Sequence, residues 1–391
     1  MFKLKIWPVC MAFVICFPAH AGITWGEADS ELGALTLSGA LRAKFQNKDF
    51  SAPADDNKIQ FDMAVLKFDY DAKKWFGKFE YRCYQYAELC DFSPLVTAHI
   101  GYKLKDNDRL TMGIQPIPFG PAQYWDSSYF AGLNNTLGLN DVHYLGVNYQ
   151  THFNTGTQID LAYFPRDAGN YIGSSRNASR YSAAMIKAQA SDQGAMHTHL
   201  KEKQMWVGRV MHDFDLFDQN LNYRIGASYW YSDIENRKNN RDGSRHTWAV
   251  FNRLSMQDAA FTLTAGKIDL DNKDRDQSLS SSFGSFDTEY ELANQGYFYT
   301  LDSRYTFNDV RDGLNISPYL VLSAFDKSEK GFETSQRHIA GLLFSYKNMS
   351  LYTEYLMSKN DAFVGGTRQA FAQGDGDGWN KMMNMEFSYN F

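Results

Sequence analysis

Proline and long apolar runs are both scarce in this sequence. The chain holds 9 Pro among 391 residues, and past residue 17 no apolar run approaches the length of a spanning helix. Such a helix needs about 20 apolar residues, so a helical membrane protein is excluded. Proline removes a donor from a β-ladder, and a low proline content is typical of a chain that is nearly all strand. No long low-complexity linker divides the chain, which indicates one domain.

Cysteine and charge are also limited. Of the four Cys, Cys10 and Cys16 fall in a predicted leader, which leaves Cys83 and Cys90 seven residues apart. In an oxidising compartment such a pair forms either a local disulfide or two unpaired thiols, and both outcomes stay open. Neither suggests catalysis, a cofactor or a metal site. Charged residues make up 21% of the chain.

Aromatic residues, by contrast, are abundant. They make up 16% of the chain, with 24 Tyr and 29 Phe, while the mean hydropathy is −0.46. A transmembrane β-barrel combines one apolar band, two aromatic girdles and a polar interior, which gives this composition. A soluble β-sandwich is the competing interpretation, but it does not need so many Tyr and Phe at strand ends.

The first 21 residues are predicted to be a signal peptide. Lys3 and Lys5 precede a mostly apolar run over residues 6–17, and Ala19-His20-Ala21 offers the small-x-small pattern of a cleavage site. Cleavage there leaves a mature domain of 22–391, which is 370 residues. The protein is therefore expected to be exported.

The last eleven residues alternate strictly in polarity, as a strand between lipid and water requires. One face of 381–391 carries Met383, Met385, Phe387, Tyr389 and Phe391. The other carries Asn384, Glu386, Ser388 and Asn390. The terminal Phe391, with aromatics two and four residues before it, resembles the signature by which the barrel assembly machinery recognises outer-membrane barrels.

Alternating segments separated by turn signals predict about sixteen strands, within a range of 14–18. The predicted strands are 35–46, 59–70, 75–86, 95–104, 109–115, 142–150, 156–164, 203–214, 221–231, 245–254, 261–270, 293–307, 314–325, 335–346, 351–359 and 380–391.

The connections between these strands are alternately short and long. Residues 71–74, 105–108 and 347–348 are short, whereas 116–141, 165–202, 232–244, 271–292, 326–334 and 360–379 are long. This rhythm is typical of an all-β, closed antiparallel transmembrane β-barrel with short periplasmic turns and long outer loops. It predicts a Gram-negative outer membrane, with its lipid and lipopolysaccharide, as the surroundings. Sixteen strands are enough to leave an aqueous channel.

Sorting the strands by parity predicts which charged side chains face the lumen. Basic residues outnumber acidic ones about two to one in this set. The predicted pore-lining basic residues are Arg42, Lys44, Lys78, Arg82, Lys103, Arg109, Arg224, Arg253, Arg304 and Arg337. The inward carboxylates are Glu80, Asp160, Asp213, Asp302, Glu354 and Glu386.

The predicted lumen thus has the opposite charge balance to the chain. Without Lys3 and Lys5 the net charge falls from −6 to −8, and much of the excess lies in loops such as 271–291. A basic lumen beneath acidic loops favours small anions. Alternatively, these Arg and Glu side chains cross-link neighbouring strands; the two roles are compatible.

The long connection after the fifth predicted strand is rich in Pro and aromatic residues. Pro116, Pro118 and Pro121 favour an ordered non-helical path, and the stretch that follows is too apolar to float in water. We expect this loop to fold into the lumen and narrow it; packing over the rim or against a neighbouring subunit is the alternative. The predicted constriction residues are Pro118, Phe119, Gly120, Tyr124, Trp125 and Asp126.

A strand that ends in Gly-x-x-x-x-Pro-Phe-Gly, here Gly113 to Gly120, followed by an aromatic-rich loop, resembles the phosphate-selective porin O and P family. The resemblance implies a homotrimer of sixteen-stranded channels with inward-folded loops, in which Arg or Lys guides anions. The dense arginine ladder and lysine cluster of that family have no residue-by-residue match here. Phosphate, organic anions and general small solutes therefore stay open.

Three functions were weighed. The first is a porin, a passive diffusion channel for small and preferentially anionic solutes. The second is a sugar-specific channel with Tyr84, Trp125, Trp230 and Tyr319 as an aromatic slide. The third, an outer-membrane enzyme, requires a smaller barrel and a Ser, His and carboxylate set at its rim that the sequence does not indicate. The acidic net charge gives no support for nucleic-acid binding.

Overall fold

A computed structural model describes residues 22–51, 57–105, 107–189, 197–216, 221–376 and 378–391. The predicted signal peptide, residues 1–21, lies outside this part of the chain. The described residues form a closed antiparallel β-barrel whose wall contains sixteen long strands. The predicted fold class and strand number are therefore confirmed.

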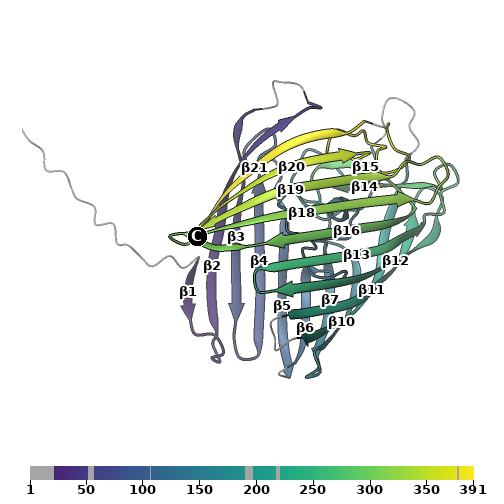
Figure 1. Cartoon of the computed structure of the whole chain (residues 1–391). Helices are drawn as coiled ribbons and strands as arrows, with labels where there is room; N and C mark the ends of the chain where they lie inside the picture. The colour runs from purple at the N-terminus through teal and green to yellow at the C-terminus, as the bar shows by residue number, and fades with distance from the viewer. Residues whose placement is uncertain (1–21, 52–56, 106, 190–196, 217–220, 377) are drawn as a thin grey trace, which may run out of the picture.

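Each wall strand pairs with its neighbours in the order of the chain, and β21 closes the wall against β2, as Figure 1 shows. The sixteen strands are β2 (Ala34–Lys48), β3 (Ile59–Asp71), β4 (Trp75–Tyr84), β5 (Leu95–Lys105), β6 (Asp108–Pro116), β7 (His143–His152), β8 (Thr157–Asp167), β10 (Leu200–Leu216), β11 (Leu221–Asn236), β12 (Arg241–Met256), β13 (Ala259–Asp271), β16 (Gln295–Tyr305), β18 (Leu314–Lys327), β19 (Ser335–Tyr346), β20 (Met349–Lys359) and β21 (Asn380–Asn390).

Two further short strands extend this wall. β1 (Ile23–Gly26) pairs with residues 34–37 of β2, and β21 pairs with residues 40–48 of the same strand. The two ends of the described chain therefore share one position in the wall. Backbone hydrogen bonds of 2.8 and 3.0 Å between Gly39 and Phe391 join them at the seam. β17 (Phe307–Arg311) pairs with the start of β18.

The two ends of the barrel differ. One end, here called the short-turn end, carries connections such as 72–74, 257–258 and 347–348. The other, the long-loop end, carries 117–142, 168–199, 272–294 and 360–379. The predicted long loop 232–244 was wrong, because β11 and β12 continue to Asn236 and from Arg241 and leave only four residues between them.

Side chains on the outer face of the wall form an apolar band, as the period of two in each strand requires. Leu161, Val210, Val250, Leu320 and Phe387 are examples, each at least 41% exposed except Val250 at 48% and Val210 at 45%, which exceed that value as well. No helix among the described residues is long and apolar enough to cross a membrane.

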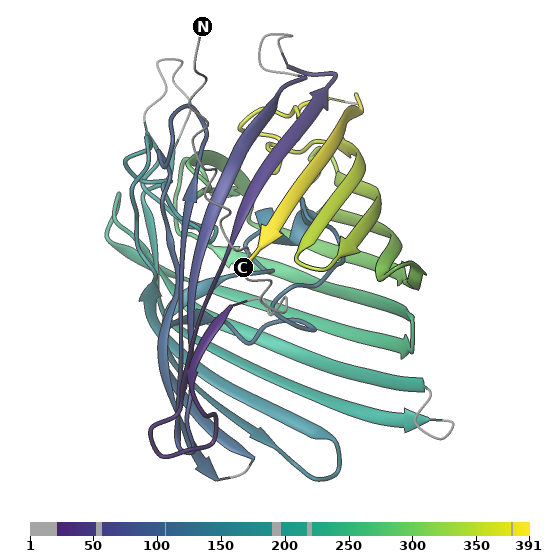
Figure 2. The same ribbon diagram turned by 90° about the vertical axis from the view of Figure 1, so that its left-hand side faces the viewer.

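The inside of the barrel departs from the predicted polar interior. β9 (Ala184–Met185), β14 (Ser280–Ser285) and β15 (Thr288–Ala293) form a small sheet from two different loops, and α1 (Leu133–Thr136) belongs to a third. Figure 2 shows the segment around α1 inside the ring of strands. These loops pack on apolar side chains of the inner wall, such as Trp230 and Phe298.

We call this packing the internal apolar cluster. Its largest members from the wall are Trp230, Ile268, Phe298 and Phe325, and its largest members from the loops are Phe119, Trp125, Phe283, Tyr290 and Phe371. The wall members all lie toward the long-loop ends of their strands. The loops therefore fill part of the long-loop half of the barrel, because burial removes their apolar side chains from water. Much of the aromatic content serves this cluster rather than the girdles.

Candidate functional site

The loop 117–142 crosses the barrel interior. At its start the Gly120 N–H donates to Ser228 Oγ of β11 at 3.0 Å, and Arg209 Nη1 of β10 donates to the Gly120 carbonyl at 3.2 Å. Farther along, the Ser127 N–H donates to Asp302 Oδ1 of β16 at 2.9 Å. The Tyr129 N–H then donates to Glu354 Oε1 of β20 at 2.7 Å. Hydrogen bonds to four wall strands thus hold the loop inside the lumen.

The six residues predicted at the constriction differ in their access to solvent. Pro118, Phe119, Gly120 and Trp125 are buried. Tyr124 is 54% exposed and Asp126 is half-buried. The first part of the loop therefore forms structural packing, and only Tyr124 and Asp126 of these six offer surface to a solute.

Gly120 makes the tight path of this loop feasible. Its φ of 74° lies in the left-handed region, which costs glycine little because it has no Cβ. A Cβ at this position would lie 2.2 Å from the Trp125 ring. The Trp125 ring therefore occupies the space in which any other residue would place its side chain.

Asp126 stabilises the turn that leads into α1. Its carboxylate accepts hydrogen bonds from the Ser128 N–H at 3.1 Å, the Ser128 hydroxyl at 2.5 Å and the Gly132 N–H at 3.0 Å. Burial raises the pKa of the Asp126 carboxyl above its usual value, and these donors counteract only part of that effect.

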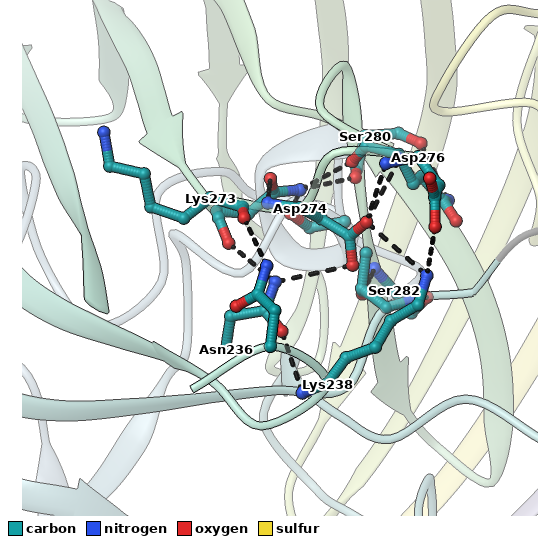
Figure 3. A network of polar contacts seen from close by, with 12 residues as sticks. Asn236, Lys238, Lys273, Asp274, Asp276, Ser280 and Ser282 are labelled. Atoms are coloured by element: carbon teal, nitrogen blue, oxygen red, sulfur yellow. Dashed lines mark hydrogen bonds and ion pairs between the residues drawn. The ribbon is translucent and has the colours of Figure 1, made fainter. Parts of the chain in front are cut away.

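Polar contacts fasten the other long loops to one another, as Figure 3 shows for the turn between β11 and β12 and the loop after β13. Lys238 Nζ lies 3.5 Å from Asp274 Oδ1 and 3.2 Å from Asp276 Oδ2. Asn236 Nδ2 donates to the Asn272 carbonyl at 3.0 Å, and Lys238 N–H donates back to Asn236 Oδ1 at 2.9 Å. The network holds two long-loop connections in one arrangement.

The loop 360–379 is fastened in a similar way. Arg368 lies 3.2 Å from Glu289 and from Glu291. Burial raises the pKa of Glu291, although the Ser282 hydroxyl and Arg368 oppose it. Arg337, predicted to line the pore, is fully buried instead: it pairs with Asp361 at 2.7 Å and donates to the Ala131 carbonyl at 3.0 Å. Its role in the structure is to hold two loops against β19.

The predicted basic residues separate into two groups by their partners. Six lie within 4 Å of a described carboxylate: Lys44 (Asp62, 2.8 Å), Lys78 (Asp69, 3.9 Å), Arg82 (Glu80, 2.5 Å), Lys103 (Asp71, 2.7 Å), Arg224 (Asp213, 2.7 Å) and Arg337 (Asp361, 2.7 Å). These pairs fit the cross-linking role that was left open beside the anion preference.

The other four, Arg42, Arg109, Arg253 and Arg304, have no ion pair with a described carboxylate. Arg42 Nη1 donates to the Tyr129 hydroxyl at 3.3 Å, and its guanidinium lies over that ring, 5.3 Å from the centroid. Arg253 donates to Ser255 Oγ at 3.3 Å. Within the described part of the chain, Arg304 has neither hydrogen bond nor ion pair. All of these except Arg109, which is exposed, are half-buried.

The inward carboxylates are far less accessible than these guanidiniums. Glu80, Asp160, Asp302, Glu354 and Glu386 are each at most 4% exposed. Asp302 and Glu354 are covered by the loop 117–142, whose N–H groups they bind. Asp213, the sixth, has a side chain that is 32% exposed and is neutralised by Arg224. A solute in the lumen therefore meets more unpaired positive charge than negative charge.

The four aromatic residues weighed as a sugar slide are buried. Tyr84, Trp125, Trp230 and Tyr319 are at most 6% exposed. Trp230 packs between Phe119, Tyr144 and the guanidinium of Arg245. Because their faces are covered by protein, they offer no surface on which a sugar ring can stack.

Sequence reasoning missed a buried hydrogen-bonded set on β5, β7 and the loops. His143 Nε2 lies 2.9 Å from Asp141 Oδ1, and its Nδ1 lies 3.0 Å from Thr97 Oγ1. The Tyr181 hydroxyl donates to the same carboxylate. Each of these side chains is at most 8% exposed, so the set is closed to solutes and fastens the loops 117–142 and 168–199 together. No spacing in the sequence signals it.

The structure joins Cys83 at the end of β4 to Cys90 by a disulfide. The enclosed loop is also stabilised by Asp91, which accepts hydrogen bonds from the N–H groups of Tyr86, Ala87 and Glu88. Burial by itself would raise the pKa of Asp91, but these donors lower it below its usual value. Among the described residues, no group of three or more His, Cys, Asp or Glu side chains could hold a metal ion.

Comparisons with known proteins give fold similarity alone. No protein-family model and no curated protein match the chain. The outer-membrane channel DcaP of Acinetobacter baumannii has a TM-score of 0.60 at 12% identity, over 94% of this chain and 99% of that one. Salmonella typhi OmpF, in complex with daunomycin, gives 0.59 at 13%, over 92% and 98%. An anion-selective porin from Comamonas acidovorans gives 0.52 at 13%, over 92% and 100%. The fold is that of the outer-membrane porins.

Proposed function

We propose that this protein is a porin of the Gram-negative outer membrane, through which small hydrophilic solutes diffuse passively and anions pass preferentially. The short-turn end then faces the periplasm and the long-loop end faces the outside, as in outer-membrane barrels generally. The proposal assigns the chain no catalytic activity. It leaves the preferred anion unnamed, since no residue-by-residue match to a phosphate site supports phosphate.

The width of the barrel supports a channel rather than a membrane anchor. Barrels of sixteen strands leave an aqueous lumen, whereas eight-stranded barrels fill theirs with side chains. The loops occupy part of the long-loop half here, but the inner wall nearer the short turns carries half-buried charged groups such as Arg253 and Arg304. Solvated charges on an inner wall are expected where water reaches it.

One observation carries the anion preference: the accessible and unpaired charges of the lumen are guanidiniums, while the carboxylates are buried. Arg42, Arg253 and Arg304 have no described carboxylate partner, whereas Glu354 and Glu386 are at most 1% exposed. Charged groups that line a pore set its selectivity through the field that a permeating ion meets. Buried carboxylates bound by N–H or hydroxyl donors contribute less to this field than open guanidiniums.

The test is the reversal potential of the purified full-length protein in a planar bilayer under a tenfold KCl gradient. We expect current steps and a reversal potential with the sign of chloride preference. A cation-selective sign would overturn the anion preference while leaving the channel. Absence of current steps from protein with the heat-dependent mobility of a folded barrel would overturn the channel itself.

The proposal includes a homotrimer assembled in lipid and lipopolysaccharide. The homotrimer rests on the resemblance carried by Gly113 to Gly120. The barrel assembly machinery is proposed to recognise the chain through Phe391, whose backbone closes the wall seam with Gly39. Chemical cross-linking in native membranes should give a ladder that ends at three copies; a ladder that ends at one copy would contradict the homotrimer without touching the channel.

A further inference from the structure

A cavity of about 490 Å³ opens at the short-turn end of the lumen, away from Arg253 and Arg304. We call it the short-turn cavity. Its wall comes from the inner faces of β1 to β6, and the side chains that matter here are Asp69, Phe76, Lys78, His99, Lys103 and Arg109. Its volume lies in the range of sites for small organic molecules, about 300–1,000 Å³.

The register of the wall brings these residues together. Asp69 of β3 pairs with Lys78 of β4, and Lys78 pairs with His99 of β5, so the three form one row. In the next row Phe76 pairs with Gly101. A Cβ on Gly101 would lie 2.0 Å from the Phe76 ring, so this glycine leaves the space in which the ring lies along the wall.

The charges in the cavity are mostly compensated, with one exception. Lys103 Nζ lies 2.7 Å from Asp71 Oδ1 and 3.7 Å from Asp29 Oδ1. Lys78 Nζ lies 3.9 Å from Asp69 Oδ1. Arg109 has no ion pair with a carboxylate of the described residues; its guanidinium lies 5.8 Å from the centroid of the Phe76 ring. The cavity thus offers one uncompensated cation next to one half-buried aromatic ring.

This pairing fits a ligand that carries one negative charge and an apolar body. An Arg guanidinium binds a carboxylate through two parallel hydrogen bonds, and the Phe76 ring offers an apolar contact beside it. The carboxylates of Asp69 and Asp71 lie in the same cavity, and they would repel the second charge of a dianion. A compact inorganic dianion therefore fits the site less well than an organic monoanion.

We propose that the short-turn cavity binds small organic monocarboxylates, with the carboxylate on Arg109 and the apolar part against Phe76. The inference rests on the proposed channel function and names a solute class for it: such acids would pause here before they leave the lumen. The cavity is distinct from the half-buried guanidiniums of Arg42, Arg253 and Arg304, which act on any anion.

The test measures equilibrium binding of benzoate to the full-length protein in detergent micelles by isothermal titration calorimetry, with inorganic phosphate as competitor. We expect benzoate to bind, phosphate not to displace it, and R109Q to weaken binding about tenfold, as for a lost charge-assisted hydrogen bond. R109K should restore part of the affinity, because it keeps the charge without the planar fork. F76L tests the apolar contact without leaving a void beside Gly101.

The control is K105Q, which removes an exposed cation at the neighbouring turn and should bind benzoate as the unmodified chain does. Equal benzoate affinity of R109Q and the unmodified protein would overturn the assignment, as would displacement by phosphate at similar concentration. Each variant is accepted only if it keeps the heat-dependent gel mobility of the folded barrel.

The two proposals fail separately. If the protein conducts chloride but micelles bind no benzoate, the cavity inference is wrong and the channel stands. If the protein does not conduct, the channel is wrong, and the calorimetry still decides whether Arg109 and Phe76 form a carboxylate site. If both hold, benzoate added on the short-turn side should reduce the current of the unmodified channel more than that of R109Q.

Discussion

Arg253 of β12 lies directly opposite Arg224 of β11 in the register of the wall. Arg224 is held by two hydrogen bonds of 2.7 and 2.9 Å to Asp213. Arg253 contacts Ser255 but has no ion pair with a described carboxylate. Two like charges opposite each other on adjacent strands are destabilising, and such an arrangement persists more readily where water and permeating anions screen the charges.

The double variant R253Q/R304Q should weaken anion selectivity. Removing two uncompensated guanidiniums from the lumen is expected to lower the chloride-to-potassium permeability ratio by about twofold or more. The ratio follows from the reversal potential in a planar bilayer under a KCl gradient. R311Q is the matched control, because the Arg311 side chain is 86% exposed at a short turn, outside the lumen. An unchanged ratio in R253Q/R304Q would remove these two residues from the selectivity mechanism.

The variant W230A should destabilise the protein without affecting sugar passage. Trp230 is fully buried in the internal apolar cluster, and deleting such a side chain costs about 3–5 kcal/mol. We expect the folded band on gels to be lost at a lower temperature. Trp206 is 58% exposed on the outer face, so W206A, the control, should shift the transition much less. If maltohexaose blocked the unmodified channel and W230A relieved the block, the buried role of Trp230 would be refuted.

The variant G120A should disturb the loop 117–142 through the Trp125 ring. A Cβ at 2.2 Å from that ring cannot be accommodated without a shift, and we expect a cost of about 1–3 kcal/mol together with a changed tryptophan fluorescence. Gly331 also has a positive φ, 88°, but open space around its Cβ position. G331A therefore isolates backbone strain, and equal effects of the two variants would exclude the Trp125 contact as the cause.

The disulfide between Cys83 and Cys90 should protect the loop that it encloses. Opening it frees a short loop, with a loss of about 2 kcal/mol in the chain-entropy account. In the double variant C83S/C90S, chymotrypsin should cleave faster next to Leu89, which is 67% exposed. Reduced wild-type protein provides the control and should be cleaved at the same rate as the variant. Equal cleavage of oxidised and reduced protein would show that Asp91 alone holds the loop.

The contact between loops 117–142 and 168–199 should weaken in acid. Burial alone would raise the pKa of Asp141, but hydrogen bonds from His143 and Tyr181 lower it below its usual value. A lowered folded-state pKa gives stability that is present above about pH 4, the unfolded value, and is lost as the pH falls through the folded value. Hydrogen exchange of residues 117–142 should therefore accelerate below about pH 4.

In the variant D141N this stabilisation should already be absent at pH 7, and the acid step should shrink. The control is D312N, which changes a carboxylate whose side chain is 88% exposed at a short turn. An acid step of full size in D141N would assign the pH dependence to another group.

The wall of the barrel was predictable from the sequence because its signals are local. Strict alternation between adjacent residues determines which side chains meet lipid, and turn residues mark where each strand ends. All sixteen strands were placed correctly, and 335–346 matched β19 (Ser335–Tyr346) residue for residue. The same parity argument identified Arg253 and Arg304 as inward residues without any contact being known. Only the stretch from 232 to 244 was wrong, because its polar residues read as loop although they continue β11 and β12.

The interior depended on the tertiary structure. Parity says that Arg253 and Arg337 both face inward, but it cannot say that Arg337 is sealed by Asp361 and a loop carbonyl while Arg253 stays without such a partner. Which carboxylates are covered, which aromatics leave the lipid face for the internal apolar cluster, and which walls enclose the short-turn cavity all depend on contacts between residues up to hundreds of positions apart. Periodicity acts between neighbours in the chain, and these contacts form only once the wall has closed.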